Sequence, residues 1–190
     1  ILTNLCAGLF ILPFFLFSAT AGQVADKYDK TTIIRLVKGA EILIMVLAGI
    51  GFHLQQLWML LTALFLMGTH SSVFGPIKYA ILPQNLTKDE LVGGNALVET
   101  GTSLAILLGS MLGGYLISLG PEGRDVVSWT VLGIALAGFY AGWQIPDSPA
   151  VNPSLRINWN PLSETWHNYQ FVRRNRVVML SVLGISWFWY

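Results

Sequence analysis

Charged residues are scarce in this sequence. Asp, Glu, Lys and Arg make up 11% of its 190 residues, whereas about a quarter of the residues in soluble domains are charged. Hydrophobic residues make up 54%, and the mean hydropathy is +0.60. This composition excludes a soluble fold and indicates an all-α membrane protein whose partner is the lipid bilayer. The net charge of +1 gives no broad basic surface, so we expect no nucleic acid partner.

Cysteine and histidine are also rare. Cys6 is the only cysteine, so it forms no intramolecular disulfide, and the three histidines are too scattered to build a metal cluster with it. None of the histidines begins the H-x-x-x-x-D motif of acyltransferases, and the sequence contains no nucleophile elbow. We therefore expect no metal, no cofactor and no catalysis by this chain.

Long hydrophobic runs dominate the sequence. A helix needs about 20 residues to cross a bilayer core of about 30 Å. We predict spans at 1–21, 32–53, 57–74, 88–118 and 126–145, and the start of another at 177. Gly75 and Pro76 are expected to break the third run, and a capping box from Thr87 to Glu90 is expected to begin the fourth. The sequence cuts its first and last runs, so we expect one more helix before it and a second half after it.

The stretch 146–176 differs from the runs around it. It is rich in proline and ends with a basic cluster, Arg173, Arg174 and Arg176. Asn160 and Pro161 predict the start of a short amphipathic helix that lies on the membrane surface. The sequence therefore divides into an incomplete N-terminal bundle (1–145), an interdomain linker (146–176) and the beginning of a C-terminal bundle (177–190).

Positive charges are unevenly distributed between the loops. If successive loops alternate sides, ten of the eleven Lys and Arg residues fall on one side and only Arg124 on the other. Under the positive-inside rule, the basic side faces the cytoplasm. We therefore predict a multi-pass protein with the linker in the cytoplasm.

A charged segment between the first two runs resembles a family signature. Gly22, Asp26 and Lys27 match G-x-x-x-D-R/K-x-G-R/K-R/K, which the major facilitator superfamily carries between its helices two and three. Asp29 stands where that pattern has Gly, and Thr31 where it has a second basic residue. The resemblance implies the major facilitator fold, with helices two to six and the start of helix seven in this chain. It assigns Gly22, Asp26 and Lys27 to the conformational switch; the alternative is charge that only fixes topology.

Further segments resemble the bacterial lysophospholipid transporter branch of this superfamily. They are FGPIKYAILP at 74–83, NALVE at 95–99 and AILLGS at 105–110. The stretch from NWNP at 158–161 to WFW at 187–189 resembles forms fused to acyltransferase and acyl-ACP synthetase domains. The resemblance implies a transporter or flippase that moves a lysophospholipid, similar to lysophosphatidylethanolamine, across the bacterial inner membrane for re-acylation. Its expected partners are that lipid and a fused or associated acyltransferase.

Two other functions stay open. One is a proton-coupled transporter of another small molecule from the same superfamily, although such transporters often carry an arginine in helix four and 57–74 contains none. The other is the transporter portion of a larger acyltransferase enzyme.

Lys78 is the first candidate for substrate binding. It follows the expected Gly75-Pro76 break, where irregular backbone lines a cavity, and its ammonium suits a phosphate. The alternative is a lysine that marks the membrane interface. Glu99, about 18 Å along its helix, is the candidate for the headgroup amine; the alternative is a fixed ion pair between helices. Asn95 lies one turn earlier on the same polar stripe as Glu99.

Three weaker patterns lie within the runs. Lys38 and Glu41 are three positions apart and are predicted to pair on their helix surface. His70 is interpreted as hydrogen-bonded packing rather than as part of a site. Gly109 and Gly113 form a G-x-x-x-G pattern, which permits close approach of two helices.

Overall fold

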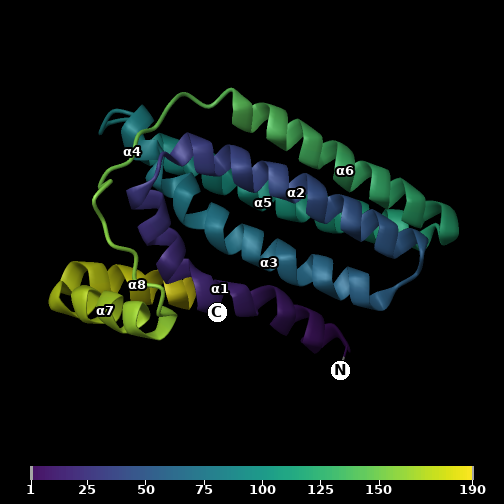
Figure 1. Cartoon of the computed structure of the whole chain (residues 1–190), viewed down its shortest axis with the longest axis horizontal. Helices are drawn as coiled ribbons and strands as arrows, with labels where there is room; N and C mark the ends of the chain where they lie inside the picture. The colour runs from purple at the N-terminus through teal and green to yellow at the C-terminus, as the bar shows by residue number, and fades with distance from the viewer. Residues whose placement is uncertain (1, 190) are drawn as a thin grey trace.

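The structure is a computed structural model that describes residues 2–189; Ile1 and Tyr190, which end two of the predicted runs, lie outside the described residues. Every regular element in this range is a helix, which confirms the predicted all-α class. Figure 1 shows long helices lying beside one another and two short helices stacked at one end. In chain order the helices are α1 (Leu2–Lys27), α2 (Lys30–His53), α3 (Leu57–Ala80), α4 (Leu82–Asn85), α5 (Leu91–Ser118), α6 (Pro121–Trp143), α7 (Pro161–Arg174) and α8 (Arg176–Trp189).

Four stretches of the described residues are long and apolar enough to cross a membrane. They are Leu2–Lys27, Leu57–Asn85, Leu91–Ser118 and Pro121–Trp143. The helix α2 is not among them, and it carries the charged residues Lys30, Arg35, Lys38 and Glu41. It nevertheless packs along both α3 and α6 (Figure 1), so a bilayer crossed by those two helices is crossed by α2 as well.

The junction between α1 and α2 is shorter than predicted. We expected the first span to end at Ala21 and a polar loop to follow, but α1 stays helical to Lys27 and α2 begins at Lys30. The Asp29 carboxylate closes this tight turn, because it accepts a hydrogen bond from the Thr32 amide at 2.7 Å and caps α2. A capping residue therefore occupies the position at which the superfamily pattern has glycine.

The predicted break at Gly75 and Pro76 is wrong. The helix α3 continues through both residues and ends at Ala80. Pro76 removes one amide donor from the helix, but membrane helices tolerate this loss where neighbouring elements surround the freed carbonyl. That carbonyl belongs to Ser72, whose residue is 0% exposed. The interruption comes after Ala80, where α4 follows as a short separate helix.

The starts of α5 and α6 also differ from those predicted. Glu90 does accept a hydrogen bond from the Thr87 amide, at 3.0 Å, but the Thr87 hydroxyl donates to the same carboxylate instead of capping the helix. Consequently α5 begins at Leu91. These two bonds, the amide bond first, lower the pKa of Glu90. The helix α6 begins at Pro121 because Gly120, with φ 75°, turns the chain directly before it.

Glycines set the closest approaches between helices. A Cβ added at Gly68 of α3 would lie 2.4 Å from the backbone oxygen of Phe10 in α1, so these two helices touch backbone to backbone. A Cβ added at Gly142 of α6 would lie 3.5 Å from a side chain of α2. Gly109 and Gly113 of α5, at which we expected close approach, have nothing within 4 Å among the described residues. The contact at Gly142 is of ordinary van der Waals length, whereas Gly68 marks a tight contact between α1 and α3; further tight contacts lie at Gly51 of α2, against α3, and at Gly123 of α6, against α5.

The segment between α6 and α7 is fastened to the bundle. It runs along the end at which α1 and α6 finish and α2 begins, which we call the basic end (Figure 1). A backbone hydrogen bond of 2.9 Å joins Ser148 to α2, and another of 2.8 Å joins Asn152 to α1. The Asn158 amide donates to the Gln23 side chain of α1 at 2.8 Å. Most of the predicted linker is therefore held against the first two helices.

The predicted short helix in the linker is confirmed. The Asn160 carboxamide oxygen accepts hydrogen bonds from the amides of Leu162 and Ser163, both at 3.1 Å, and Pro161 occupies the first helical position. The helix α7 packs on α1 and on α8. Asn175 separates α7 from α8 and caps α8 through its side-chain oxygen.

Candidate functional site

Lys78 lies in the last turn of α3, inside a regular helix rather than in irregular backbone. Its ammonium donates a hydrogen bond to the Thr102 hydroxyl of α5 at 3.2 Å. It also lies 4.8 Å from the ring centroid of Tyr79, within the range of a cation–π interaction. The Lys78 charge is therefore directed toward α5.

Glu99 of α5 lies toward the same end of α3, next to Tyr79. The Tyr79 hydroxyl donates a hydrogen bond to its carboxylate. Lys78 and Tyr79, which are adjacent in α3, thus contact Thr102 and Glu99, which lie about one turn apart in α5. We call Lys78, Tyr79, Glu99 and Thr102 the α3–α5 cluster. The structure brings the two predicted residues, Lys78 and Glu99, into one cluster but pairs each with a different hydroxyl.

The chemistry of the α3–α5 cluster suits a ligand with both charges. A lysine ammonium has three donors, and the hydrogen bond to Thr102 uses one of those of Lys78. A carboxylate accepts several hydrogen bonds, and the bond from Tyr79 uses one oxygen of Glu99. The cluster can therefore offer donors to a phosphate and acceptors to an ammonium. Sequence reasoning missed the role of Tyr79, although its position beside Lys78 was a usable signal.

Asn95 shares a helix face with Glu99 but does not join the contacts of the cluster. Its side chain donates to the Leu91 carbonyl of its own helix at 2.8 Å, and the residue is exposed. Its oxygen remains available to a ligand approaching along this face.

The predicted switch residues lie in the last turns of α1. Gly22, Asp26 and Lys27 are helical rather than part of a loop, which corrects the predicted turn. The backbone carbonyl of Asp26 accepts a hydrogen bond from the Asn152 amide, so this end of α1 is tied to the segment between α6 and α7. The side chain of Lys27 lies 5.7 Å from the ring centroid of Tyr28.

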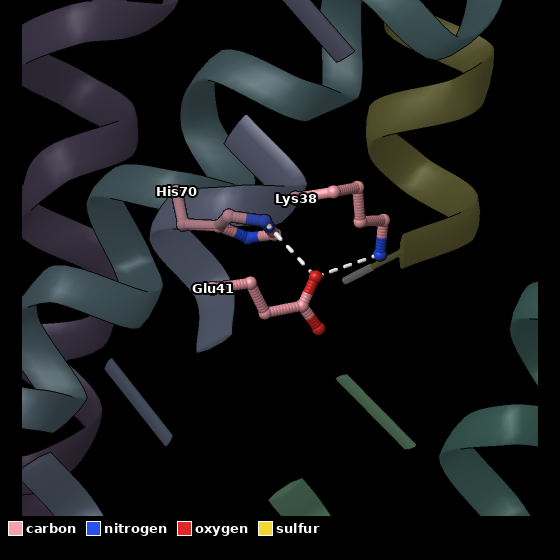
Figure 2. A network of polar contacts seen from close by, with 3 residues as sticks. All are labelled: Lys38, Glu41 and His70. Atoms are coloured by element: carbon pink, nitrogen blue, oxygen red, sulfur yellow. Dashed lines mark hydrogen bonds and ion pairs between the residues drawn. The ribbon is translucent and has the colours of Figure 1, made fainter. Parts of the chain in front are cut away.

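A second group of charged residues lies inside the bundle. Figure 2 shows Lys38 and Glu41 of α2 beside His70 of α3. The Lys38 ammonium lies 2.7 Å from Glu41 Oε2, which confirms the predicted pair. His70 Nε2 lies 3.3 Å from the same oxygen, within ion-pair range but without the alignment of a hydrogen bond. We call Lys38, Glu41 and His70 the interior network.

The interior network is well buried. The side chains of Lys38, Glu41 and His70 are 19%, 13% and 7% exposed. The His70 ring stacks on Phe74 with centroids 5.9 Å apart, and the Lys38 ammonium lies 4.9 Å from the centroid of the same ring. We had assigned His70 to packing alone; its approach to Glu41 from another helix left no pattern in the sequence.

Comparison with known proteins gives a family match over nearly the whole chain. The family model described as Major Facilitator Superfamily matches residues 2–190. No solved structure matches the chain.

Several curated relatives carry the same printed name, lysophospholipid transporter LplT. The protein from Klebsiella pneumoniae subsp. pneumoniae is 31% identical over 185 residues, and that from Escherichia fergusonii is 30% identical over 192 residues. The protein from Enterobacter sp. (strain 638) is 28% identical over 183 residues. Each alignment covers 95% of this chain and 44% of the relative, so the chain spans less than half the length of these relatives.

Proposed function

Because the chain belongs to the major facilitator superfamily, we propose that it is part of a transporter that moves a lysophospholipid across a bacterial inner membrane. The observation that carries the proposal is the α3–α5 cluster. It places an ammonium and a carboxylate on facing helices, each with hydrogen-bonding capacity left over. The relatives named lysophospholipid transporters support the same substrate class.

The cluster fits a zwitterionic headgroup. Lys78 would bind the phosphate as a point charge, while Glu99 would bind the ammonium of a lysophosphatidylethanolamine. Asn95 would add an amide contact one turn away. A single acyl chain needs no polar lining, so the remainder of the pathway can stay apolar and close to lipid.

Orientation and movement complete the proposal. We place the basic end in the cytoplasm, because positive residues collect there, and expect flipping from the outer to the inner leaflet. The bundle 1–145 would rock against a second bundle that begins at 177, with 146–176 between them. Gly22, Asp26 and Lys27 would control this change from the end of α1. A fused or separate acyltransferase would then re-acylate the delivered lipid.

Transport by the full-length protein in proteoliposomes tests the assignment. Labelled lysophospholipid is added to the outer leaflet, and the fraction protected from extraction by albumin is followed in time. We expect Lys78→Gln and Glu99→Gln each to slow lysophosphatidylethanolamine transport by about 10- to 100-fold, the equivalent of one charge-assisted hydrogen bond. Lys88→Gln and Glu122→Gln, which change exposed charges, are the matched controls and should transport normally.

Comparing two lipid headgroups distinguishes the proposed role of Glu99 from that of Lys78. Glu99→Gln should leave lysophosphatidylglycerol transport unchanged, since that lipid has no amine, whereas Lys78→Gln should slow both lipids. Wild-type rates in both variants with both lipids would rule out the α3–α5 cluster as the headgroup site.

A further inference from the structure

A groove lies between the beginning of α2 and the end of α6, at the basic end of the bundle. Figure 1 shows α6 along one edge of the bundle with α2 packed beside it. The groove measures ≈ 450 Å³ and is lined by Thr32, Arg35, Leu36, Gly39, Phe139 and Trp143. The residues of the α3–α5 cluster are not part of this lining, so the groove is separate from the proposed headgroup site.

Arg35 supplies the charge of the groove. Its Nη2 donates a hydrogen bond to the Trp143 backbone carbonyl at 3.3 Å, and its guanidinium carbon lies 4.9 Å from the centroid of the Trp143 ring. Arg35 forms no ion pair within residues 2–189. Its Nε is buried without a partner among those residues, so a ligand would bind the two terminal nitrogens. A guanidinium carries four of its five donors on these nitrogens, and the Trp143 carbonyl takes one.

The face of α2 that borders the groove is apolar and exposed. Leu36 and Leu43 are seven positions apart and therefore share one side of the helix, and they are 69% and 71% exposed. In a protein that crosses a membrane, such a face favours contact with lipid. Trp143, which is 59% exposed at the end of α6, belongs to the residue type that collects at the level of the lipid headgroups. The groove therefore opens toward the bilayer near its headgroup region.

The lining of the groove changes from polar to apolar along α2. Thr32 and Arg35 come first from the basic end, and Gly39 follows one turn farther into the bundle. Gly39 keeps the groove open beside Phe139, because a Cβ there would already lie 3.7 Å from the Phe139 ring. This order matches a phospholipid, which places its phosphate at the interface and its acyl chains toward the apolar core.

The groove also distinguishes between lipid charges. No acidic side chain of residues 2–189 lines it. Asp29, the acidic residue closest to Thr32 in sequence, accepts the amide hydrogen bond that caps α2. A phosphate would therefore meet an unpaired cation, whereas the ammonium of a zwitterionic lipid would find no carboxylate in the lining.

We propose that this groove is a binding site for one anionic phospholipid, such as phosphatidylglycerol, from the leaflet at the basic end. The Arg35 guanidinium binds the phosphate through two parallel hydrogen bonds. An acyl chain lies along Leu36 and Phe139. This lipid stays bound to the outside of the bundle instead of being transported, so the site goes beyond the proposed function.

Native mass spectrometry of the full-length protein in detergent tests the proposal. The protein is titrated with dioleoyl phosphatidylglycerol or with dioleoyl phosphatidylethanolamine, and the dissociation constant of the first bound lipid is measured. We expect the wild type to bind phosphatidylglycerol about 10-fold more tightly, and Arg35→Gln to lose this preference. Lys88→Gln, which removes an exposed charge near the same end of the bundle, is the matched control and should keep it. Equal binding of the two lipids by the wild type would overturn the proposal.

A second variant tests the apolar part of the groove. Gly39→Leu fills the space beside Phe139 and keeps Arg35, so it should weaken phosphatidylglycerol binding by about 10-fold. It keeps the test open if Arg35→Gln does not fold. Binding as in the wild type by whichever of the two variants folds would overturn the proposal, because the lipid would then lie elsewhere.

Two other occupants would give different results. Loss of the preference in Lys78→Gln instead of Arg35→Gln would place the lipid in the α3–α5 cluster. A dimer that depends on Arg35 and forms without lipid would assign the groove to a second copy of the protein. Either result would overturn the proposal. Because the assay measures binding of diacyl lipids and not transport, its failure would leave the transport proposal untouched.

Discussion

Replacing Gly68 by alanine tests the backbone contact that joins α1 to α3. The added Cβ would lie 2.4 Å from the Phe10 oxygen and 3.1 Å from its carbonyl carbon. Carbon and oxygen in close weak contacts stay about 3.3 Å apart, so the helices must separate locally by roughly 1 Å. A main-chain carbonyl in a helix cannot rotate aside as a side chain does. Overpacking of this kind costs about 1–3 kcal/mol.

Gly133→Ala in α6 is the matched control, because a Cβ there meets nothing within 4 Å among the described residues. Both changes gain the same helix propensity, about 1 kcal/mol relative to glycine, so this gain cancels when the variants are compared. The free energy of unfolding of Gly68→Ala should fall about 1–3 kcal/mol below that of Gly133→Ala. Titration of the detergent-solubilised full-length protein with SDS measures both. Equal free energies of unfolding would refute the backbone contact.

Three further changes probe individual contacts. Tyr79→Phe removes the donor to Glu99 and should lower the free energy of unfolding by about 1–2 kcal/mol in the same SDS titration; no change would mean that water replaces the hydroxyl. Asp29→Ala should lower the stability of the first turn of α2 by about 1 kcal/mol, and Asp29→Gly by only a few tenths of a kcal/mol. Hydrogen exchange of the amides in that turn measures both changes. Equal losses of stability would argue against capping by Asp29. The lowered pKa of Glu90 means that its bonds to Thr87 stabilise the turn at neutral pH and are lost as pH falls through that pKa. Corrected amide exchange at the start of α5 should therefore rise in the wild type as the pH falls below the usual pKa of a glutamate side chain, but not in Glu90→Gln.

Four of the predicted spans were predictable because the thickness of a bilayer fixes the length of each hydrophobic run, whereas the charged helix α2, which we also predicted as a span, is not apolar enough to be recognised by this criterion. Helix ends were less predictable, because a turn signal in the sequence competes with packing. Gly75 and Pro76 carry a strong local signal for a break, yet the surroundings of Ser72 keep α3 helical. Asp29 shows the reverse effect, since a cap formed by one side chain shortens a predicted loop to two residues, Tyr28 and Asp29.

The candidate site was predictable only in part. Lys78 and Glu99 stand out in the sequence because a charge inside an apolar run is costly. Their partners depend on how α3 and α5 are rotated toward each other, which hydropathy does not encode. The pair of Lys38 and Glu41 follows from helical spacing, whereas the contact of His70 with Glu41 crosses between helices and has no local signature.

The fastened linker has a mechanical consequence. Ser148, Asn152 and Asn158 are bonded to α1 and α2, and α7 packs on α1, so the chain up to Arg174 moves with the first bundle. In a transporter with two bundles, the joint then falls at Asn175 instead of at Pro146, where the composition changes. Rocking between two such halves would then be absorbed by the torsion angles around this residue. A junction of one residue restricts relative motion more than a long flexible linker does, and its stiffness would limit how far the two halves separate.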